Sequence, residues 1–433
     1  MTRASFGAAR SRRWRRRWLA LGLAMASAIG LAGSSRAGAQ PTVAAPGAAA
    51  TPASRYAIYL LTMGQGDALW EKFGHNALVV RDRQTGQGVA WNWGVFDFAA
   101  PDFLSRFLTG DTRYWMAPDD FAATLDRYRW LNRSLVLQEL AIPDSAVGPL
   151  LAAISANARD DAKYYRYDYF LDNCSTRVRD AINRATGGAL ERTLRNRAAG
   201  TTYRRETMRL LSTMPAAAIG VDVALGARAD RPLSDWEASF VPMTLRDGVR
   251  AVRMPDGAGG TQPLVRREEA LFTATRPAES AAPTAYAPLL ALAGLVGAAL
   301  LLALSRSTAT SARLATTGLA VLWSLVAGVV GVVLLLAATV TRHVFWGANA
   351  NLLLFSPLAL VLVVVLPLAL RRPAVGVVAR GVAMGVVASA AVGVVVALAM
   401  HQPIAATAAV ALPLHVATVL AVRRLSGGAS RAG

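Results

Sequence analysis

Hydrophobic and polar positions alternate differently in the two parts of this chain. Up to about residue 280 short apolar runs are mixed with polar ones, and their spacing predicts both strands and helices. The expected strands are 56–62, 76–81 and 89–95. The expected helices are 117–130, 144–158, 174–186 and a region of roughly 203–226, and a hairpin is expected at 249–272. With most strands early and most helices late, residues 55–273 are predicted to form an α+β domain.

Beyond this domain the pattern changes to long runs of Ala, Val, Leu and Gly. Five runs each approach the length that crosses the hydrocarbon core of a bilayer: about 287–304, 314–340, 352–370, 381–400 and 404–422. We therefore expect an all-α, five-span transmembrane domain at 287–425. A linker at 274–286 would precede it, and a cytoplasmic tail at 426–433 would follow.

The N-terminal segment has the pattern of a secretory signal. Arginines precede an apolar stretch at 18–33, and Ala37 and Ala39 supply the small residues of a cleavage site. Residues 1–39 are thus predicted to be a signal peptide or an uncleaved signal anchor, followed by a Pro/Ala-rich linker at 40–54. Either form would place the α+β domain outside the cytoplasm.

Charge agrees with this orientation. The formal net charge is +19, but the arginines flank apolar runs and do not form a nucleic-acid reader motif, so no nucleic-acid partner is expected. Arginines lie between the first and second spans, between the third and fourth, and after the fifth, whereas the other loops contain only Arg342. This bias predicts a multi-pass protein of the bacterial inner membrane with the α+β domain in the periplasm.

Candidate chemistry centres on Cys174, the one cysteine of the chain. Asn173 is a favourable N-cap, so Cys174 would be the first residue of a helix, where free N–H groups and the helix dipole favour a thiolate. A buried, inert cysteine is the alternative. Other charged residues of the domain, including Arg133 and Arg177, are expected in surface or structural ion pairs.

A thiol nucleophile requires a base, and of the four histidines only His75 lies in the α+β domain. His75 opens a predicted strand, which could pack on the Cys174 helix; an exposed His75 without a catalytic role is the alternative. Asn92 is preferred as the group that orients the imidazole, with Asn76 and Asp97 also open. No metal site and no cofactor are predicted, because one cysteine and one histidine make an incomplete ligand set.

The loop between the second and third spans contains further polar residues. Its sequence is TRHVFWGANANLLLF, and it would lie on the same side of the membrane as Cys174. We predict that the loop binds substrate, because polar side chains beside an aliphatic span are costly unless they have a purpose. The candidate residues are Arg342, His343, Asn349 and Asn351. An ordinary interfacial turn is the alternative.

Two family resemblances rest on these motifs. FGHNALVV and DNCSTRVRD resemble the permuted NlpC-type peptidase and lecithin retinol acyltransferase group, which implies a permuted papain-like thiol domain. A longer series, including LLTMGQGDALWEKFGHNALVVRD, FLTGDTRYW, RYRWLNRSLVLQEL and KYYRYDYFLDNCSTRVRDAI, resembles the Lnb family of bacterial lipoprotein N-acyltransferases. The segment MGQGD departs from the family pattern, in which a Cys or small residue and Pro-Gly precede the acidic position.

The Lnb resemblance implies that Cys174 is the acyl-accepting nucleophile and His75 its general base. A phospholipid would be the acyl donor, and the amine of a lipoprotein's N-terminal diacylglyceryl-cysteine the acceptor. Two alternatives stay open: a periplasmic NlpC-like cysteine amidase or peptidase of the cell wall, and a non-catalytic membrane module that binds lipoproteins. The oligomeric state and the preferred lipoprotein are not specified by these patterns.

Overall fold

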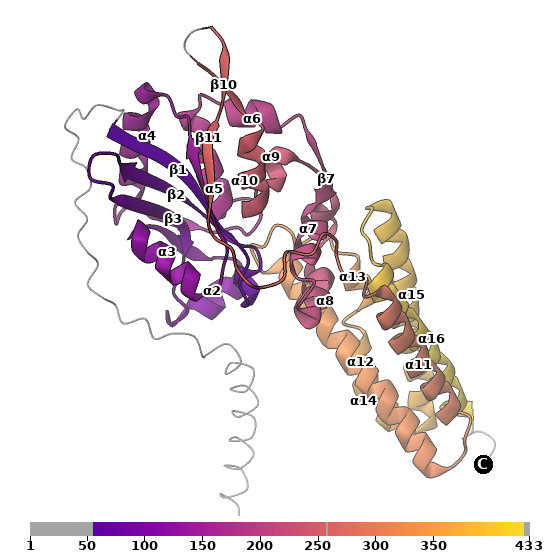
Figure 1. Cartoon of the computed structure of the whole chain (residues 1–433). Helices are drawn as coiled ribbons and strands as arrows, with labels where there is room; N and C mark the ends of the chain where they lie inside the picture. Colours follow the sequence, from indigo (N-terminus) through magenta and orange to yellow (C-terminus); the bar gives the residue numbers. More distant parts are fainter. Residues whose placement is uncertain (1–54, 257–258, 428–433) are drawn as a thin grey trace, which may run out of the picture. The chain divides into compact units, whose positions relative to one another are not determined.

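The computed structural model describes residues 55–427 except 257–258, which form an α+β domain and a bundle of apolar helices (Figure 1). We call residues 55–273 the thiol domain. The predicted signal segment 1–39, the predicted linker 40–54 and residues 428–433 of the predicted tail lie outside the described residues.

The thiol domain is built on one seven-stranded sheet with the order β11-β5-β1-β2-β3-β4-β6. All neighbouring strands are antiparallel. The strands are β1 (Tyr56–Met63), β2 (His75–Asp82), β3 (Gly88–Val95), β4 (Arg113–Asp120), β5 (Leu135–Leu140), β6 (Tyr164–Arg166) and β11 (Val265–Phe272). Two small two-stranded sheets accompany this sheet: β7 (Ala198–Thr202) with β8 (Pro232–Ser234), and β9 (Arg253–Pro255) with β10 (Thr261–Pro263).

Helices cover both faces of the sheet. They are α2 (Phe103–Thr109), α3 (Phe121–Trp130), α4 (Asp144–Asn157), α5 (Cys174–Ala185), α6 (Ala189–Leu194), α7 (Tyr203–Leu210), α8 (Pro215–Ala224), α9 (Asp235–Ala238) and α10 (Pro242–Arg250), with short 3-10 turns η2 (Leu69–Glu71) and η3 (Ala227–Asp230). One core joins Leu60 and Leu78 to Ile182 of α5, and the other joins Leu61 and Val79 to Phe121 of α3. Because successive side chains of a strand point to opposite faces, β1 and β2 are apolar almost throughout.

Three sequence predictions are corrected by this fold. The helix expected from residue 117 begins only at Phe121, because 117–120 belong to β4 and Asp120 caps α3 by accepting a hydrogen bond from the Ala123 N–H at 2.8 Å. The helical region at 203–226 is divided into α7 and α8, with Pro215 at the start of α8. The hairpin at 249–272 is limited to β9 and β10, since β11 pairs with β5 as an edge of the main sheet.

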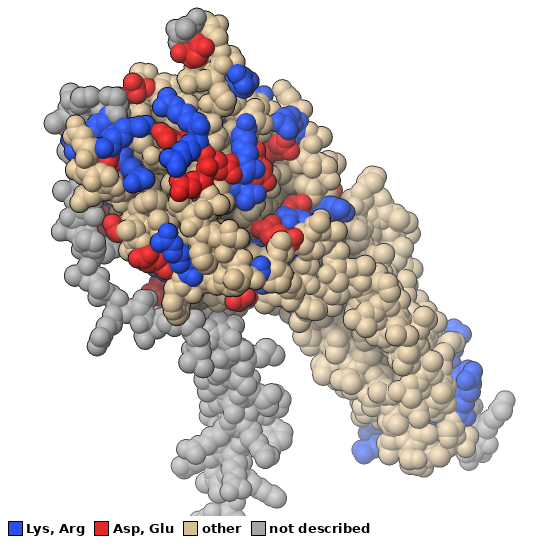
Figure 2. All heavy atoms as spheres, viewed as in Figure 1, with Lys and Arg blue, Asp and Glu red and all other residues tan. Residues whose placement is uncertain are grey.

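The predicted five apolar spans are confirmed as helices long and apolar enough to cross a membrane. They are α11 (Ala287–Leu304), α12 (Thr310–Thr339), α13 with α14 (Asn351–Leu354 and Ala359–Ala369), α15 (Pro373–Ala399) and α16 (Ala405–Gly427). Glycines allow close helix packing: a Cβ at Gly294 of α11 would meet the backbone of Ala409 and Val410 in α16. Figure 2 shows charged side chains over the thiol domain, and an almost uncharged bundle with Lys and Arg side chains at its lower end.

One end of the sheet continues into the helical bundle. Across four neighbouring strands Phe272 pairs with Leu135, Leu135 with Met63, and Met63 with His75. The chain leaves this row through residues 273–286, which contain no helix or strand, and enters α11. We call this the membrane-side end of the sheet.

The connecting segment is held against the thiol domain. The Arg276 side chain donates hydrogen bonds to the carbonyls of Leu131 (3.0 Å) and Asn132 (2.7 Å). Glu279 pairs with Arg209 of α7 at 3.1 Å. The segment predicted as a linker is therefore hydrogen-bonded to the surface of the thiol domain before the chain enters the apolar helices.

Candidate functional site

Cys174 is the first residue of α5, as the sequence predicts. The Asn173 side chain accepts a hydrogen bond from the Thr176 N–H at 2.9 Å, which caps the helix. The Asn173 amide also donates to the carbonyl of Phe240 at 3.0 Å. The thiol at this position is thus fixed by a cap that is itself anchored to a distant segment.

Helix α5 packs on the two strands that carry His75 and Asn92. Asn76, the neighbour of His75, donates a hydrogen bond to the Ser175 hydroxyl at 3.0 Å. Gly94 has φ +84°, and a Cβ there would lie 3.6 Å from the Cys174 Cβ and 3.2 Å from the Tyr167 ring. A larger residue at 94 would therefore be strained and would crowd the thiol.

His75 is bonded to Asn92. The distance from His75 Nε2 to Asn92 Oδ1 is 3.1 Å, while the Asn92 amide nitrogen donates to the Ala90 carbonyl at 3.1 Å. Because the amide NH₂ is directed to Ala90, the oxygen faces the imidazole, and this arrangement assigns the proton to Nε2 and the lone pair to Nδ1. Of the other two candidates, Asn76 bonds to Thr62 and Ser175, and Asp97 to the Ala99 N–H.

The resting thiol and imidazole are both neutral. Burial raises the pKa of the Cys174 thiol to about 11, although the backbone N–H groups of Asn76 and Ser175 oppose this shift. Burial also lowers the pKa of His75 to about 4, against the Asn92 hydrogen bond. The backbone N–H groups thus favour the thiolate as the sequence predicts, but loss of hydration has the larger effect on the thiol pKa. Within the described part of the chain no hydrogen bond joins Cys174 to His75.

The reactivity of Cys174 should accordingly rise steeply with pH. Without substrate, alkylation by iodoacetamide is expected to accelerate roughly tenfold per pH unit between about pH 7 and 10, because only the thiolate reacts. Mass spectrometry of the Cys174 peptide measures this rate. A Gln84→Cys thiol in a Cys174→Ala background is the exposed control, with a rate that levels off above a pKa of about 8.5. A plateau for Cys174 near neutral pH would instead indicate a thiolate–imidazolium pair.

Arg133 also belongs to this site, although the sequence analysis assigned it to an ordinary ion pair. Its side chain is buried; Nε donates to the Gly64 carbonyl at 2.8 Å, and Nη1 lies 3.5 Å from Glu71. Among the residues that the structure describes, none is a hydrogen-bond partner of Nη2. The ion pair exists, but the same guanidinium lowers the pKa of both Cys174 and His75, after the larger effect of burial. The RYRWLNRSL motif gave no signal of this burial.

The predicted substrate-binding residues lie where the span-joining loop meets the thiol domain. The Arg342 N–H donates to the Thr109 carbonyl at 2.7 Å, and its guanidinium pairs with Asp111 at 3.1 Å. His343 Nε2 lies 2.8 Å from the Phe107 carbonyl, and its ring stacks on Trp346 with centroids 3.9 Å apart. The loop is thus attached to α2 and to the residues that follow it.

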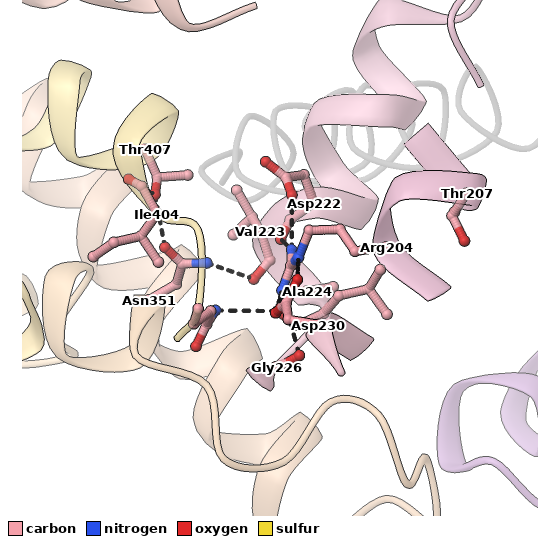
Figure 3. Close-up of polar contacts among 12 residues, drawn as sticks. Arg204, Thr207, Asp222, Val223, Ala224, Gly226, Asp230, Asn351, Ile404 and Thr407 are labelled. Atoms are coloured by element: carbon pink, nitrogen blue, oxygen red, sulfur yellow. Dashed lines mark hydrogen bonds and ion pairs between the residues drawn. The ribbon is translucent and has the colours of Figure 1, made fainter. Parts of the chain in front are cut away.

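Asn349 and Asn351 both bond to the C-terminal end of α8, and Figure 3 shows Asn351 beside Val223. The Asn349 amide donates to the carbonyls of Val223 (2.8 Å) and Ala224 (3.1 Å), and the Asn351 amide to Val223 at 3.2 Å. These carbonyls are among those that a helix C-terminus leaves without intrahelical partners. The contacts show a structural use for both side chains, and a role in substrate binding stays a prediction.

Arg204 of α7 completes the cap from the opposite side (Figure 3). It donates to the carbonyls of Asp222 at 2.6 Å and Leu225 at 2.7 Å. Its guanidinium also pairs with the carboxylates of Asp222 and Asp230, each at 2.7 Å. Side chains from the thiol domain and from the span-joining loop therefore converge on one helix end, which we call the α8 junction.

Among the described residues no group of three or more His, Cys, Asp or Glu side chains is placed to hold a metal ion. The permuted papain-like topology expected from the NlpC-type resemblance stays a prediction; what the structure shows is an α+β sheet domain and five apolar helices.

Comparison with known proteins identifies the thiol domain. A family model described as the Lnb N-terminal periplasmic domain matches residues 45–212. No curated protein and no solved structure matches the chain. The matched segment includes His75, Asn92 and Cys174. The match thus assigns residues 45–212 of this chain to the Lnb N-terminal periplasmic domain.

Proposed function

We propose that this protein is a membrane-bound lipoprotein N-acyltransferase that carries its acyl group on Cys174. The observation that supports this best is the placement of the thiol. Cys174 begins α5 beside the strands of the bonded His75–Asn92 pair, at the end of the sheet from which the chain enters its apolar helices. The match to the Lnb N-terminal periplasmic domain and five helices able to span a membrane agree with this placement.

The first half-reaction forms a thioester. His75 Nδ1 takes the proton of the Cys174 thiol as Sγ attacks the ester carbonyl of a phospholipid. The tetrahedral intermediate collapses when the carbon–oxygen bond of the ester breaks. The departing lysophospholipid alcohol takes the proton from His75, so that the imidazole is neutral again and the acyl group is on sulfur.

The second half-reaction forms an amide. The amine of a lipoprotein's N-terminal diacylglyceryl-cysteine attacks the thioester carbonyl and gives a proton to His75 Nδ1. The carbon–sulfur bond then breaks, and His75 returns the proton to the Cys174 sulfur. Asn92 holds the imidazole with Nε2–H engaged, which keeps Nδ1 available in both steps.

Local electrostatics favour the charged intermediates. The backbone N–H groups of Asn76, Ser175 and Cys174 itself all act on the sulfur and lower the pKa of the thiol, against burial. The same donors would stabilise negative charge on an oxygen bonded to the carbon that the sulfur attacks. Because the site is poorly hydrated, these interactions are stronger than they would be in water.

Membrane attachment also has a chemical purpose in this proposal. Donor phospholipid and lipidated acceptor both reside in a membrane leaflet, so an enzyme tethered to the inner membrane, with its thiol domain in the periplasm, meets them at a raised effective concentration. Five spans are more than one anchor requires, which favours lateral access of lipid.

The experiment is a reconstituted assay with the full chain, phospholipid vesicles and a synthetic diacylglyceryl-cysteine peptide. The expected product is the peptide with one added acyl chain. It should form through a thioester on Cys174, from which hydroxylamine releases the acyl group. A cell-wall amidase would instead release peptides from peptidoglycan without any dependence on lipid. A non-catalytic lipoprotein-binding module would bind the peptide and leave its mass unchanged. Either result would overturn the proposal.

A further inference from the structure

The exposed large apolar side chains of the thiol domain are unevenly distributed. They occur in η2, in the segment after β3, in α2 and at the end of α3; Leu104 is 65% exposed and Trp130 84% exposed. Two more, Tyr164 and Leu171, lie on β6 and in the loop before Cys174. Between residues 172 and 286 the described part of the chain exposes no large apolar side chain of this kind.

The topology brings the first four segments to one end of the sheet. Trp70 lies in the connection from β1 to β2, and Phe98 and α2 lie in the connection from β3 to β4. Trp130 ends α3 immediately before β5 begins. Because the strands are antiparallel, all of these connections are at the membrane-side end. At the opposite end, the β2–β3 turn at 83–87 is fully exposed and contains only Arg, Gln, Thr and Gly.

Aromatic contacts link the members of this set in η2, in the segment after β3 and in α2. The Trp70 and Phe98 rings have centroids 4.7 Å apart, Phe98 and Phe103 4.9 Å, and Phe103 and Phe107 6.2 Å. A contiguous exposed patch of this kind marks an interaction site more often than a free surface.

The chemistry of the partner follows from where α2 is attached. The carbonyls of Phe107 and Thr109 are bonded to His343 and Arg342 of the loop that joins the second and third spans. That loop lies between α12 and α13, where two apolar helices end. The patch is thus continuous with the loop at which two of the candidate spans end, which is where a bilayer crossed by these spans would have its surface.

We propose that the surface formed by Trp70, Phe98, Leu104, Phe107, Leu108 and Trp130 is immersed in the headgroup–acyl boundary of the bilayer that the spans cross. Its apolar side chains contact lipid acyl chains, and its tryptophans take the interfacial position that this residue prefers. The proposal requires the spans but not the acyl-transfer chemistry. Immersion of this surface can therefore be tested independently of the proposed function.

The test uses the full chain with Cys174→Ala and one introduced cysteine, Leu104→Cys or Leu108→Cys, carrying a nitroxide label. Gln84→Cys, in the exposed β2–β3 turn, is the matched control. The protein is placed in nanodiscs of phosphatidylethanolamine and phosphatidylglycerol, and collisions with O₂ and with a water-soluble nickel chelate are compared. The α2 labels are expected to favour O₂, at a depth of roughly 5–10 Å, and the Gln84 label to favour nickel.

Nickel accessibility at Leu104 and Leu108 equal to that at Gln84 would overturn the proposal. So would shielding that appears only together with short label–label distances between two copies, because the partner would then be a second chain. A measurement without labels guards against disturbance of α2. Lipids brominated on their acyl chains should quench the fluorescence of Trp70, so Trp70→Phe removes part of the quenching while Trp93→Phe, at a buried site, does not.

Discussion

Replacing Cys174 with alanine is expected to abolish both acyl-enzyme formation and transfer, with a loss on the order of 10⁴-fold or more. The sulfur is the atom that accepts the acyl group in the proposed reaction, and no other cysteine exists in the chain to replace it. The substitution removes one atom from a buried position at the first turn of α5. The stability cost should be about 1 kcal/mol, so loss of activity would not reflect unfolding.

Cys174→Ser and His75→Ala refine this prediction. A serine hydroxyl has a far higher pKa than a thiol, so a base suited to a thiol should activate it poorly. His75→Ala should lower the rate of thioester formation by about 10²–10⁴-fold. His401→Asn is the control for loss of an imidazole, because His401 is exposed between the fourth and fifth spans and has φ +55°, which asparagine tolerates.

The readout separates chemistry from binding. Intact mass after incubation with phospholipid vesicles should show one acyl group on the parent protein, lost on treatment with hydroxylamine. The Cys174→Ala protein should show none, while the His401→Asn protein should match the parent. Normal acyl transfer by Cys174→Ala would rule out the thiol mechanism.

Arg204→Met is expected to cause a large loss of stability in the thiol domain. Arg204 is 5% exposed and bonds to two carboxylates and to carbonyls at the α8 junction. Methionine fills the volume but leaves the Asp230 carboxylate and the Leu225 carbonyl without these donors. Removing one partner of a buried ion pair costs about 3–5 kcal/mol, which corresponds to a fall of roughly 6–20 °C in the midpoint of thermal unfolding.

The loss should depend on pH in a defined direction. Burial raises the pKa of Asp230, and Arg204 opposes this shift. A group whose native pKa is raised favours the folded state while it is protonated and disfavours it once it ionises. Without Arg204 the pKa of Asp230 rises further, so the destabilisation should shrink as the pH falls and Asp230 becomes protonated.

Tryptophan fluorescence during heating of the detergent-solubilised chain measures this effect. The neighbouring Arg205 is exposed on the same helix, and Arg205→Met should change the free energy of unfolding by no more than about 0.5 kcal/mol. Equal midpoints for the two variants would mean that the α8 junction contributes little to stability.

Local sequence patterns were sufficient to predict an element where the interactions that stabilise it lie within one helical turn or one apolar span. The five apolar helices follow from composition, because a bilayer accepts only long apolar segments. The Asn173 cap of α5 depends on Thr176, three residues away. Segments whose pairing is remote were misjudged or missed: 117–120 became part of β4, and β11 joined β5 at the edge of the sheet.

Sequence by itself therefore determined which residues are chemically available: one thiol, one histidine in the thiol domain and five segments that require lipid. Only the tertiary structure decided the hydrogen-bond partners and the protonation of these residues. Asn92 became the partner of His75 because β2 and β3 pair, and burial made the Cys174 thiol neutral despite its place on a helix N-terminus. Asn349 found its partner Val223 at a separation of 126 residues. Capping and hydrophobic periodicity act over a few residues, whereas hydration and hydrogen-bond partners depend on which distant segments pack together.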